Sequence, residues 1–229
     1  MSSERLHDSV KNDAPQIDFV IGNNDKLKLL DIVGDKESTP QESEKYIFTK
    51  AYHKEGEFSS YVPIMNGCNN FCSCCIVPYV RGREVSRPVD EILEEVRRLD
   101  EEGVREITLL GQNVNSYCYE GCHFPQLLEM VCRQCRNIQW IRFESPHPKD
   151  FSEELIEVIA REPKVAKHLH VPMQSGNTRI LGLMNRRYTR EKYLDLIDKI
   201  KQRVPNVTFA LDTMGTPASQ ESSELHAHG

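Results

Sequence analysis

The sequence contains no apolar run as long as the roughly 18 residues that a membrane-spanning helix requires. Residues 1–6 also lack the basic and apolar regions of a secretory signal peptide. Positive charge is scarce, because 29 Lys and Arg residues face 35 Asp and Glu residues and leave a net charge of −6. We therefore expect a cytoplasmic protein with no membrane partner, in which any contact with nucleic acid depends on a local basic patch.

No cysteine precedes Cys68, although the 229 residues include eight cysteines. Four of the eight then stand within one short stretch, at Cys68, Cys72, Cys74 and Cys75. In a reducing cytosol, clustered cysteines bind metals or take part in catalysis more often than they form disulfide bonds. This stretch is therefore the first candidate for a functional site.

The middle of the chain alternates between strand patterns and helix patterns. Strands are expected at residues 61–65, 105–111, 138–143, 168–171 and 207–211, and helices at 88–103, 124–136, 150–160 and from 189 onward. Pro63 favours an edge or a bulge in the first strand, and helix caps are expected from Asp150 with Glu153 and from Thr189. The alternation predicts an α/β fold with a parallel sheet, either open or curled into a barrel.

The segments that flank residues 59–213 do not continue this alternation. Residues 1–35 contain one strand-like and one helix-like stretch, which is too little to bury a core alone. Residues 36–58 are polar and suit a linker, whereas residues 214–229 are rich in Ser, Glu and His and are expected to be disordered. The sequence thus predicts one core of about five βα units at residues 59–213.

The spacing Cys-x3-Cys-x2-Cys is formed by Cys68, Cys72 and Cys75, directly after the first expected strand. Three thiolates in one short loop can bind three irons of a [4Fe-4S] cluster and leave the fourth iron open to an exogenous chelating ligand. A zinc site or incidental thiols are the alternative. We predict the cluster, with these three cysteines as metal ligands, and assign no other residue to catalysis.

Small and polar residues stand at the ends of three expected strands, where a parallel barrel places its ligand-binding groups. They are Gly111 and Gln112 after the second strand, Ser145 after the third, and Gln174, Ser175 and Gly176 after the fourth. Turn formation alone is the alternative role for each of them. We predict that these residues line the cofactor site.

The remaining cysteines form two close pairs, Cys118 with Cys122 and Cys132 with Cys135. The second pair lies one helical turn apart, so a second metal site is conceivable. Cysteine is also one of the residue types most often found in protein cores. A buried or incidental role is therefore favoured for these four thiols.

Several short stretches combine into a larger pattern. They read GCNNFC at 67–72, IVPY at 76–79, RGRE at 81–84, LGQNVNSY at 110–117, SPHP at 145–148, HVPMQSG at 170–176 and MNR at 184–186. The combination resembles the radical S-adenosylmethionine (SAM) methylthiotransferase family, in which an aromatic residue usually stands at the position of Cys74. The resemblance implies an incomplete radical SAM (βα) barrel at residues 59–213, with SAM as the ligand of the open iron.

An activity follows from the same resemblance. The family member with the nearest likeness transfers a methylthio group to carbon 2 of isopentenylated adenosine next to the anticodon. The implied partners are the tRNA anticodon stem-loop and an electron donor such as a flavodoxin. Another tRNA adenosine or a ribosomal protein is the alternative substrate.

The ends of the sequence are expected to be incomplete relative to the family pattern. In the family, an N-terminal domain holds an auxiliary [4Fe-4S] cluster that supplies sulfur, and a C-terminal module grips tRNA. Residues 1–35 resemble only the end of that first domain, and no cysteine is present there. We therefore expect a truncated form that lacks the auxiliary-cluster ligands, and an inactive cluster-binding fragment is the alternative.

A local basic cluster follows the cysteines at Arg81, Arg83 and Arg87. Arginine side chains bind phosphates and carboxylates through paired N–H groups. Together with the resemblance, this cluster predicts a contact with RNA, and a solvated charged surface is the alternative.

Overall fold

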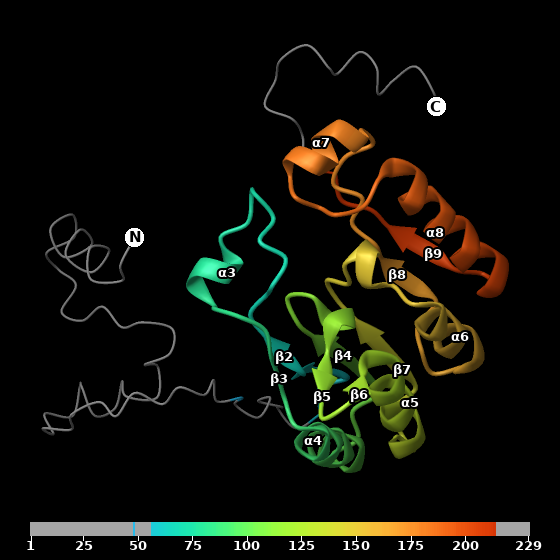
Figure 1. The fold of residues 1–229 in the computed structure, drawn as a ribbon. Coiled ribbons are helices and arrows are strands. Elements are labelled where there is room, and N and C mark those ends of the chain that lie inside the picture. The colour runs from blue at the N-terminus through green and yellow to red at the C-terminus, as the bar shows by residue number, and fades with distance from the viewer. Residues whose placement is uncertain (1–47, 49–55, 214–229) are drawn as a thin grey trace, which may run out of the picture. The chain divides into compact units, whose positions relative to one another are not determined.

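The computed structural model describes Phe48 and residues 56–213 (Figure 1). The predicted N-terminal remnant at residues 1–35, nearly all of the linker at 36–58 and the tail at 214–229 lie outside the described residues. The account below therefore concerns the predicted core alone. Within the described residues, no helix is long and apolar enough to cross a membrane.

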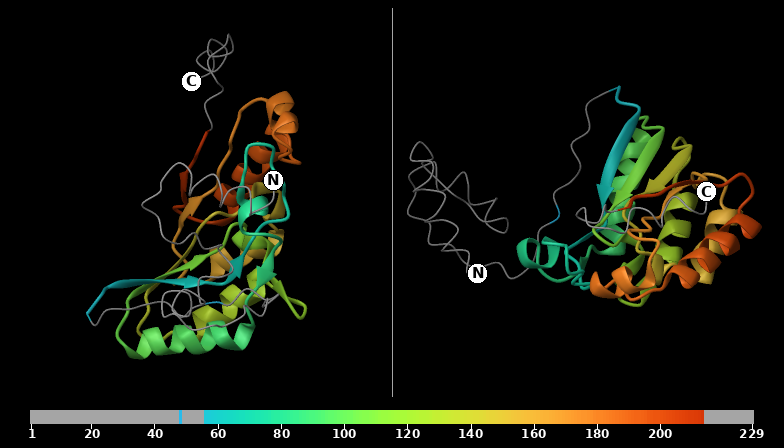
Figure 2. Two further views of the ribbon diagram at one scale, coloured as in Figure 1. Left: turned by 90° about the vertical axis from the view of Figure 1, so that its left-hand side faces the viewer. Right: turned by 90° about the horizontal axis from the view of Figure 1, so that it is seen from above.

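Five parallel strands form the centre of the fold (Figures 1 and 2). They are β1 (Ser59–Pro63), β4 (Glu106–Leu110), β7 (Trp140–Phe143), β8 (His168–His170) and β9 (Thr208–Ala210). The first three pair in the order β1-β4-β7, and β8 pairs with β9. A single parallel bridge between Ile141 and Val165 extends the pairing beyond β7. The predicted α/β fold with parallel strands is confirmed.

Four longer helices lie on one side of these strands (Figure 2). They are α4 (Val89–Glu101), α5 (Phe124–Gln134), α6 (Glu153–Arg161) and α8 (Arg190–Arg203). Each packs beside the next, α4 on α5, α5 on α6 and α6 on α8. Apolar residues at helical spacing, such as Ile92, Val96 and Leu99 of α4, are fully buried against the strands and form the core.

The two predicted helix caps have different outcomes. Thr189 caps α8, because its hydroxyl accepts a hydrogen bond from the N–H of Lys192. The predicted cap at Asp150 is wrong, since Ser152 caps α6 by accepting from the N–H of Leu155. Asp150 instead closes the short 3-10 helix η3 (Pro148–Asp150).

Short elements that the sequence did not predict surround the end of β1. β2 (Met65–Asn66) and β3 (Val85–Ser86) form an antiparallel pair, and the chain between them carries α3 (Val77–Val80). The first predicted strand therefore breaks near Ile64, and Pro63 ends β1, which has one partner strand in its ladder. Further short elements are η2 (Val114–Ser116), β5 (Cys118–Tyr119), β6 (Cys122–His123) and α7 (Thr178–Leu183).

Candidate functional site

The clustered cysteines lie in one loop, residues 67–84, which we call the cysteine loop. The β2-β3 pair holds the two ends of the loop together, and the N–H of Cys68 donates to the carbonyl of Gly82 at 3.2 Å. Asn69 and Glu84 exchange further hydrogen bonds across the base. Gly67 has a φ of +78°, and a Cβ there would stand 2.1 Å from the carbonyl oxygen of Arg83. Only glycine fits this close approach without a shift of the backbone.

A second segment, residues 183–186, is distant in sequence and forms hydrogen bonds with the tip of the cysteine loop. The hydroxyl of Ser73 donates to the carbonyl of Leu183 at 2.8 Å, and the N–H of Ser73 donates to that of Met184 at 3.1 Å. The side-chain amide of Asn185 donates to the carbonyls of Asn70 at 3.2 Å and Phe71 at 2.9 Å. These four bonds fix the loop backbone on both sides of Cys72.

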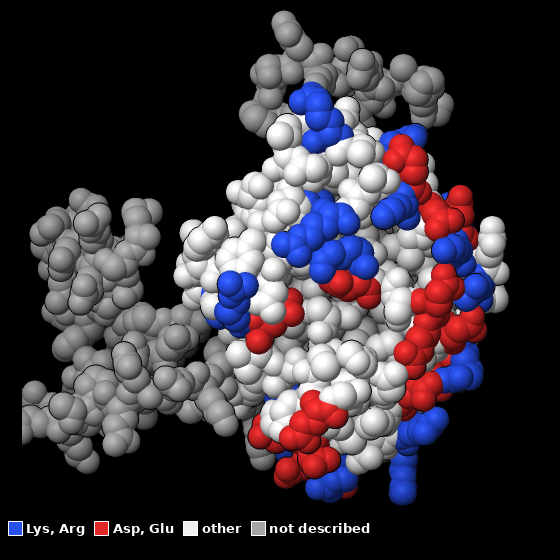
Figure 3. Space-filling model, in the orientation of Figure 1, with Lys and Arg blue, Asp and Glu red and all other residues white. Residues whose placement is uncertain are grey.

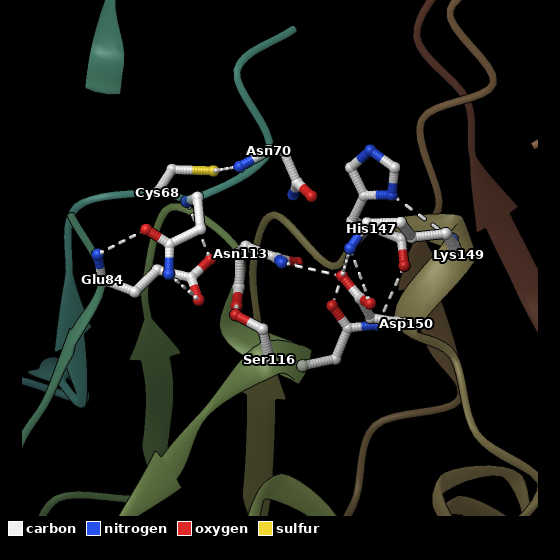
Figure 4. A network of polar contacts seen from close by, with 10 residues as sticks. Cys68, Asn70, Glu84, Asn113, Ser116, His147, Lys149 and Asp150 are labelled. Carbon is white, nitrogen blue, oxygen red and sulfur yellow. Dashed lines mark hydrogen bonds and ion pairs between the residues drawn. The ribbon is translucent and has the colours of Figure 1, made fainter. Parts of the chain in front are cut away.

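The three predicted ligands differ from Cys74 in their surroundings. Cys68 and Cys72 are buried and Cys75 is half-buried, whereas Cys74 is exposed. The N–H of Asn70 donates to the sulfur of Cys68 at 3.5 Å, and Nη1 of Arg186 donates to the sulfur of Cys72 at 3.4 Å (Figure 4 shows the first contact). Donors of this kind stabilise negative charge on sulfur.

Electrostatics of the loop match a site that is completed by a cation. Burial raises the pKa of the Cys68 thiol, the N–H of Asn70 lowers it, and the charges of Glu84, Cys72 and Cys75 raise it further. A buried thiolate next to other anions is costly unless positive charge compensates it. Iron would supply that charge, because metal binding and thiol deprotonation are coupled.

The donor set fits an iron-sulfur cluster, although the side chains do not form a ready-made cage. Among the described residues, no group of three or more His, Cys, Asp or Glu side chains is arranged to hold a metal ion. Cys68, Cys72 and Cys75 nevertheless share one clamped loop, and the charges of Cys72 and Cys75 raise the pKa of Cys68. Thiolates are the usual ligands of such clusters, so turning these side chains toward one another would complete the site.

The residues predicted to line the cofactor site all follow parallel strands at their carboxyl ends. Gly111 follows β4, and a Cβ there would stand 2.5 Å from the Cγ of Met65, at the base of the cysteine loop. Ser145 follows β7 and Gln174 follows β8, both with positive φ of 59° and 68°. The other three members are Gln112, Ser175 and Gly176. Their contact with SAM remains a prediction.

Among the described residues, four buried polar atoms in the stretches after these strands and after α7 have no hydrogen-bond partner. They are Oε1 of Gln112, Oδ1 of Asn113, Nε2 of His147 and Nε of Arg186. Such atoms are costly in a protein interior and often mark the position of a ligand or an ordered water. Sequence reasoning had not assigned Asn113, His147 or Arg186 to the site, although all three fall within the quoted family stretches.

Asn113 and His147 belong to one polar network (Figure 4). The amide of Asn113 donates to Asp150 at 2.8 Å, and Nδ1 of His147 accepts from the N–H of Lys149 at 3.3 Å. Burial lowers the pKa of His147 to about 4, and the positive charge of Arg186 lowers it as well. His147 is therefore neutral at physiological pH and leaves Nε2 free to bind a partner.

The three predicted RNA-contacting arginines do not share one environment. Arg81 and Arg83 are exposed, and the guanidinium carbon of Arg83 lies 4.4 Å from the centre of the Phe71 ring. Arg87 is only 2% exposed and is paired with the fully buried carboxylate of Glu95. The expectation that Arg87 contacts RNA is wrong, because its side chain is enclosed in the core.

The remaining cysteines do not form a second site within the described residues. Cys132 and Cys135 are buried in the core along α5, and burial raises both pKa values to about 12. Cys118 and Cys122 lie on the separate β5-β6 pair. Cys132 and Cys135 are buried, as the favoured role requires, and the role of all four thiols stays a prediction.

Comparison with known proteins places this site in a family. The Radical SAM superfamily model matches residues 62–219. The tRNA-2-methylthio-N(6)-dimethylallyladenosine synthase of Treponema pallidum (strain Nichols) is 46% identical over 96% of this chain and 54% of its own length. The enzyme of the same name from Treponema denticola is 45% identical, and the match covers 96% of this chain and 54% of that enzyme. The chain therefore spans about half the length of the curated relatives it matches.

A likeness to solved structures concerns the fold. The structure of a radical S-adenosylmethionine methyltransferase, TsrM, from Kitasatospora setae has a TM-score of 0.54 to this chain. The two sequences are 17% identical, and the match covers 67% of this chain and 30% of the TsrM chain. The family match, by contrast, extends over most of the described core, from Val62 at the first strand to beyond β9. The chain belongs to the radical SAM superfamily.

Proposed function

We propose that this chain is the radical SAM part of a tRNA methylthiotransferase, which adds a methylthio group to carbon 2 of isopentenylated adenosine next to the anticodon. The names of the relatives, at 41% to 46% identity, support the substrate. The loop that brings Cys68, Cys72 and Cys75 together beside the strand ends carries the chemical part of the proposal. We also propose a cytoplasmic location and reduction by a donor such as a flavodoxin.

The three cysteines would hold a [4Fe-4S] cluster whose open iron takes SAM, and the cluster when bound supplies the electron that cleaves SAM to a deoxyadenosyl radical. The chain's own residues position these groups. Arg186 and the N–H of Asn70 stabilise charge on the two buried sulfurs. Residues 183–186 hold the loop in place through Ser73 and Asn185.

The strand ends supply the proposed SAM site. Gly111 allows the loop after β4 to approach Met65 closely. Gln112, Ser145 and residues 174–176 present polar groups at the carboxyl ends of the strands. The unpartnered amide oxygens of Gln112 and Asn113 can accept hydrogen bonds from the amino group or the ribose hydroxyls of SAM. Arg81 and Arg83, which are exposed beside the cysteines, are proposed to contact RNA.

SAM cleavage tests the chemical part of this proposal. Anaerobically reconstituted protein with dithionite and SAM should form 5′-deoxyadenosine above a no-protein control, and Cys72→Ala protein should form none. Wild-type protein that loads iron and sulfide yet forms no deoxyadenosine would contradict the proposal.

Nucleoside analysis tests the substrate. Mass spectrometry of tRNA from cells that lack the whole gene should show isopentenylated adenosine without its methylthio group. A change in a different adenosine, or in a ribosomal protein alone, would replace the proposed substrate by the alternative one.

A further inference from the structure

A cavity of about 240 Å³ lies between the η3-α6 region and α8, apart from the residues proposed to hold the cluster and SAM. Four cations line it, Lys149, Arg187, Lys192 and Lys199, against two carboxylates, those of Glu153 and Asp195. The chain as a whole carries a net charge of −6, so an excess of positive charge here is a local feature. On the face drawn in Figure 3, Lys and Arg side chains gather near the centre, whereas many Asp and Glu side chains lie along the right-hand edge.

The ion pairs around the cavity leave two of its cations available. Lys199 lies 3.3 Å from Glu153 and 3.1 Å from Asp195, and Arg203 also pairs with Glu153 at 2.7 Å. Lys149 pairs with Asp150 at 2.9 Å. Among the described residues, the side chains of Arg187 and Lys192 have no acidic partner, and Arg187 is exposed. The cavity therefore presents two uncompensated positive charges, which favours an anionic ligand.

Arg187 lines the cavity from an unusual backbone conformation. Arg187 has a φ of 58°, a left-handed conformation that non-glycine residues keep only where their surroundings impose it. Its neighbours supply that constraint. Arg186 donates to the sulfur of Cys72, and the hydroxyl of Tyr188 donates to the carbonyl of Met173 at 2.9 Å. Adjacent arginines thus serve two places, with Arg186 at the cysteine loop and Arg187 in the cavity.

Aromatic rings complete the wall of the cavity. Phe151, Tyr188 and Tyr193 line it, and Tyr193 donates to the carbonyl of Val171 at 2.8 Å. Because both tyrosine hydroxyls are held by backbone carbonyls, the rings are fixed in position. Tyr188 and Tyr193 are only 7% and 3% exposed, so they form a rigid wall and leave the contact with an anionic ligand to the cations.

We propose that this cavity binds a phosphodiester of the substrate RNA, with Arg187 and Lys192 as its two charged contacts. This inference rests on the proposed function, in which the substrate is tRNA. A phosphate bound to Arg187 would contact the residue that directly follows Arg186, whose side chain donates to the sulfur of Cys72. The cavity would then set the distance between the RNA backbone and the cysteine loop, and so help place the reacting base.

The test compares two double variants in RNA binding. Arg187→Ala with Lys192→Ala removes the proposed contacts, and Arg136→Ala with Lys201→Ala removes the same charge from exposed positions outside the cavity. The probe is a fluorescent anticodon stem-loop RNA, and its affinity for the reconstituted chain is measured by anisotropy at several KCl concentrations. Circular dichroism verifies that each variant is folded.

Loss of both contacts to this one phosphate should raise the Kd by about tenfold or more at 0.1 M salt and reduce the slope of log Kd against log salt by about 0.7 to 0.9. The control variant should stay near wild type. An unchanged slope in the cavity variant, an equal loss in the control, or no RNA binding by the wild-type chain would overturn the proposal.

SAM cleavage without RNA, measured on the same samples, separates this inference from the proposed function. It should be equal in wild type and in the cavity variant. SAM cleavage without any RNA binding would contradict the proposed RNA-binding role of the cavity and would leave the proposed cluster chemistry unaffected. RNA binding that depends on Arg187 and Lys192, without cleavage of SAM, would contradict the proposed function and would support the RNA-binding role of the cavity.

Discussion

Arg186 donates a hydrogen bond to the sulfur of Cys72 at 3.4 Å, across 114 positions of sequence. The bond is one of several that join residues 183–186 to the cysteine loop, and it is the one that places a positive charge on a proposed cluster ligand. The second half of the core is thereby linked directly to the first cysteine-bearing loop. The site therefore depends on the packing of α7 as well as on the cysteine spacing.

Removal of this charge should change the cluster's redox behaviour. In Arg186→Ala, the loss of a charge-assisted hydrogen bond to a cluster sulfur should lower the midpoint potential by on the order of 50 mV. Arg186→Lys should recover part of the shift, and Arg190→Ala, at an exposed arginine four positions further on, is the matched control. Potentiometric titration followed by electron paramagnetic resonance measures it, and identical potentials in wild type and Arg186→Ala would contradict this role.

Gly67 is expected to tolerate no side chain. Gly67→Ala should displace the Arg83 carbonyl, which a Cβ would approach to 2.1 Å, and so open the base of the cysteine loop. We expect iron content after reconstitution to fall by more than half, while Gly82→Ala, which meets nothing within 4 Å, should keep more of its iron. Iron analysis of both proteins decides the point, and full iron in Gly67→Ala would show that the loop base is not needed.

Arg87 is expected to act in folding and not in RNA binding. Arg87→Ala removes the cation that contacts the fully buried carboxylate of Glu95 most closely and leaves Nη2 of Arg98 at 3.9 Å, which should cost about 3 kcal/mol of unfolding free energy. Arg87→Met with Glu95→Leu removes both charges and should recover most of that loss. Urea unfolding measures the difference, and a single variant as stable as wild type would show that the pair is dispensable.

His147 should make stability dependent on pH. Its folded pKa of about 4 lies below the ordinary value of 6.5, so the unfolded chain binds the proton more tightly. The stabilisation is complete above about pH 6.5 and is lost as the pH falls toward 4. Between pH 7 and pH 5 the part due to His147 should be about 2 kcal/mol. Urea unfolding of wild type and His147→Gln at both pH values measures it, and equal losses in the two proteins would refute it.

Long, strongly patterned elements could be predicted from sequence, and short ones could not. The strands β1, β4 and β7 and the amphipathic helix α4 have clear apolar patterns. The β2-β3 pair has only two residues in each strand, which leaves no period to recognise. Asp150 and Glu153 match the capping pattern, but η3 occupies the position and moves the helix start to Ser152.

Within the site, local spacing revealed the cysteines, whereas the contacts that hold them depend on the tertiary fold. Cys68, Cys72 and Cys75 are close in sequence, so a loop motif is enough to identify them. Arg87 seemed to belong to a surface cluster because its partner Glu95 is eight residues further on, inside α4. Arg186 and Asn185 reach the loop only after the βα units have packed, and no local pattern predicts such a contact.

The central claim is that Cys68, Cys72 and Cys75 together hold one [4Fe-4S] cluster with an open iron. The most direct measurement is iron content and visible absorption after anaerobic reconstitution of wild type and of each single cysteine variant. We expect about four irons per chain in wild type and in Cys74→Ser, and loss of the thiolate-to-iron absorption in Cys68→Ala, Cys72→Ala and Cys75→Ala. Loss of the cluster in Cys74→Ser with retention in Cys75→Ala, or about eight irons in wild type, would contradict the account.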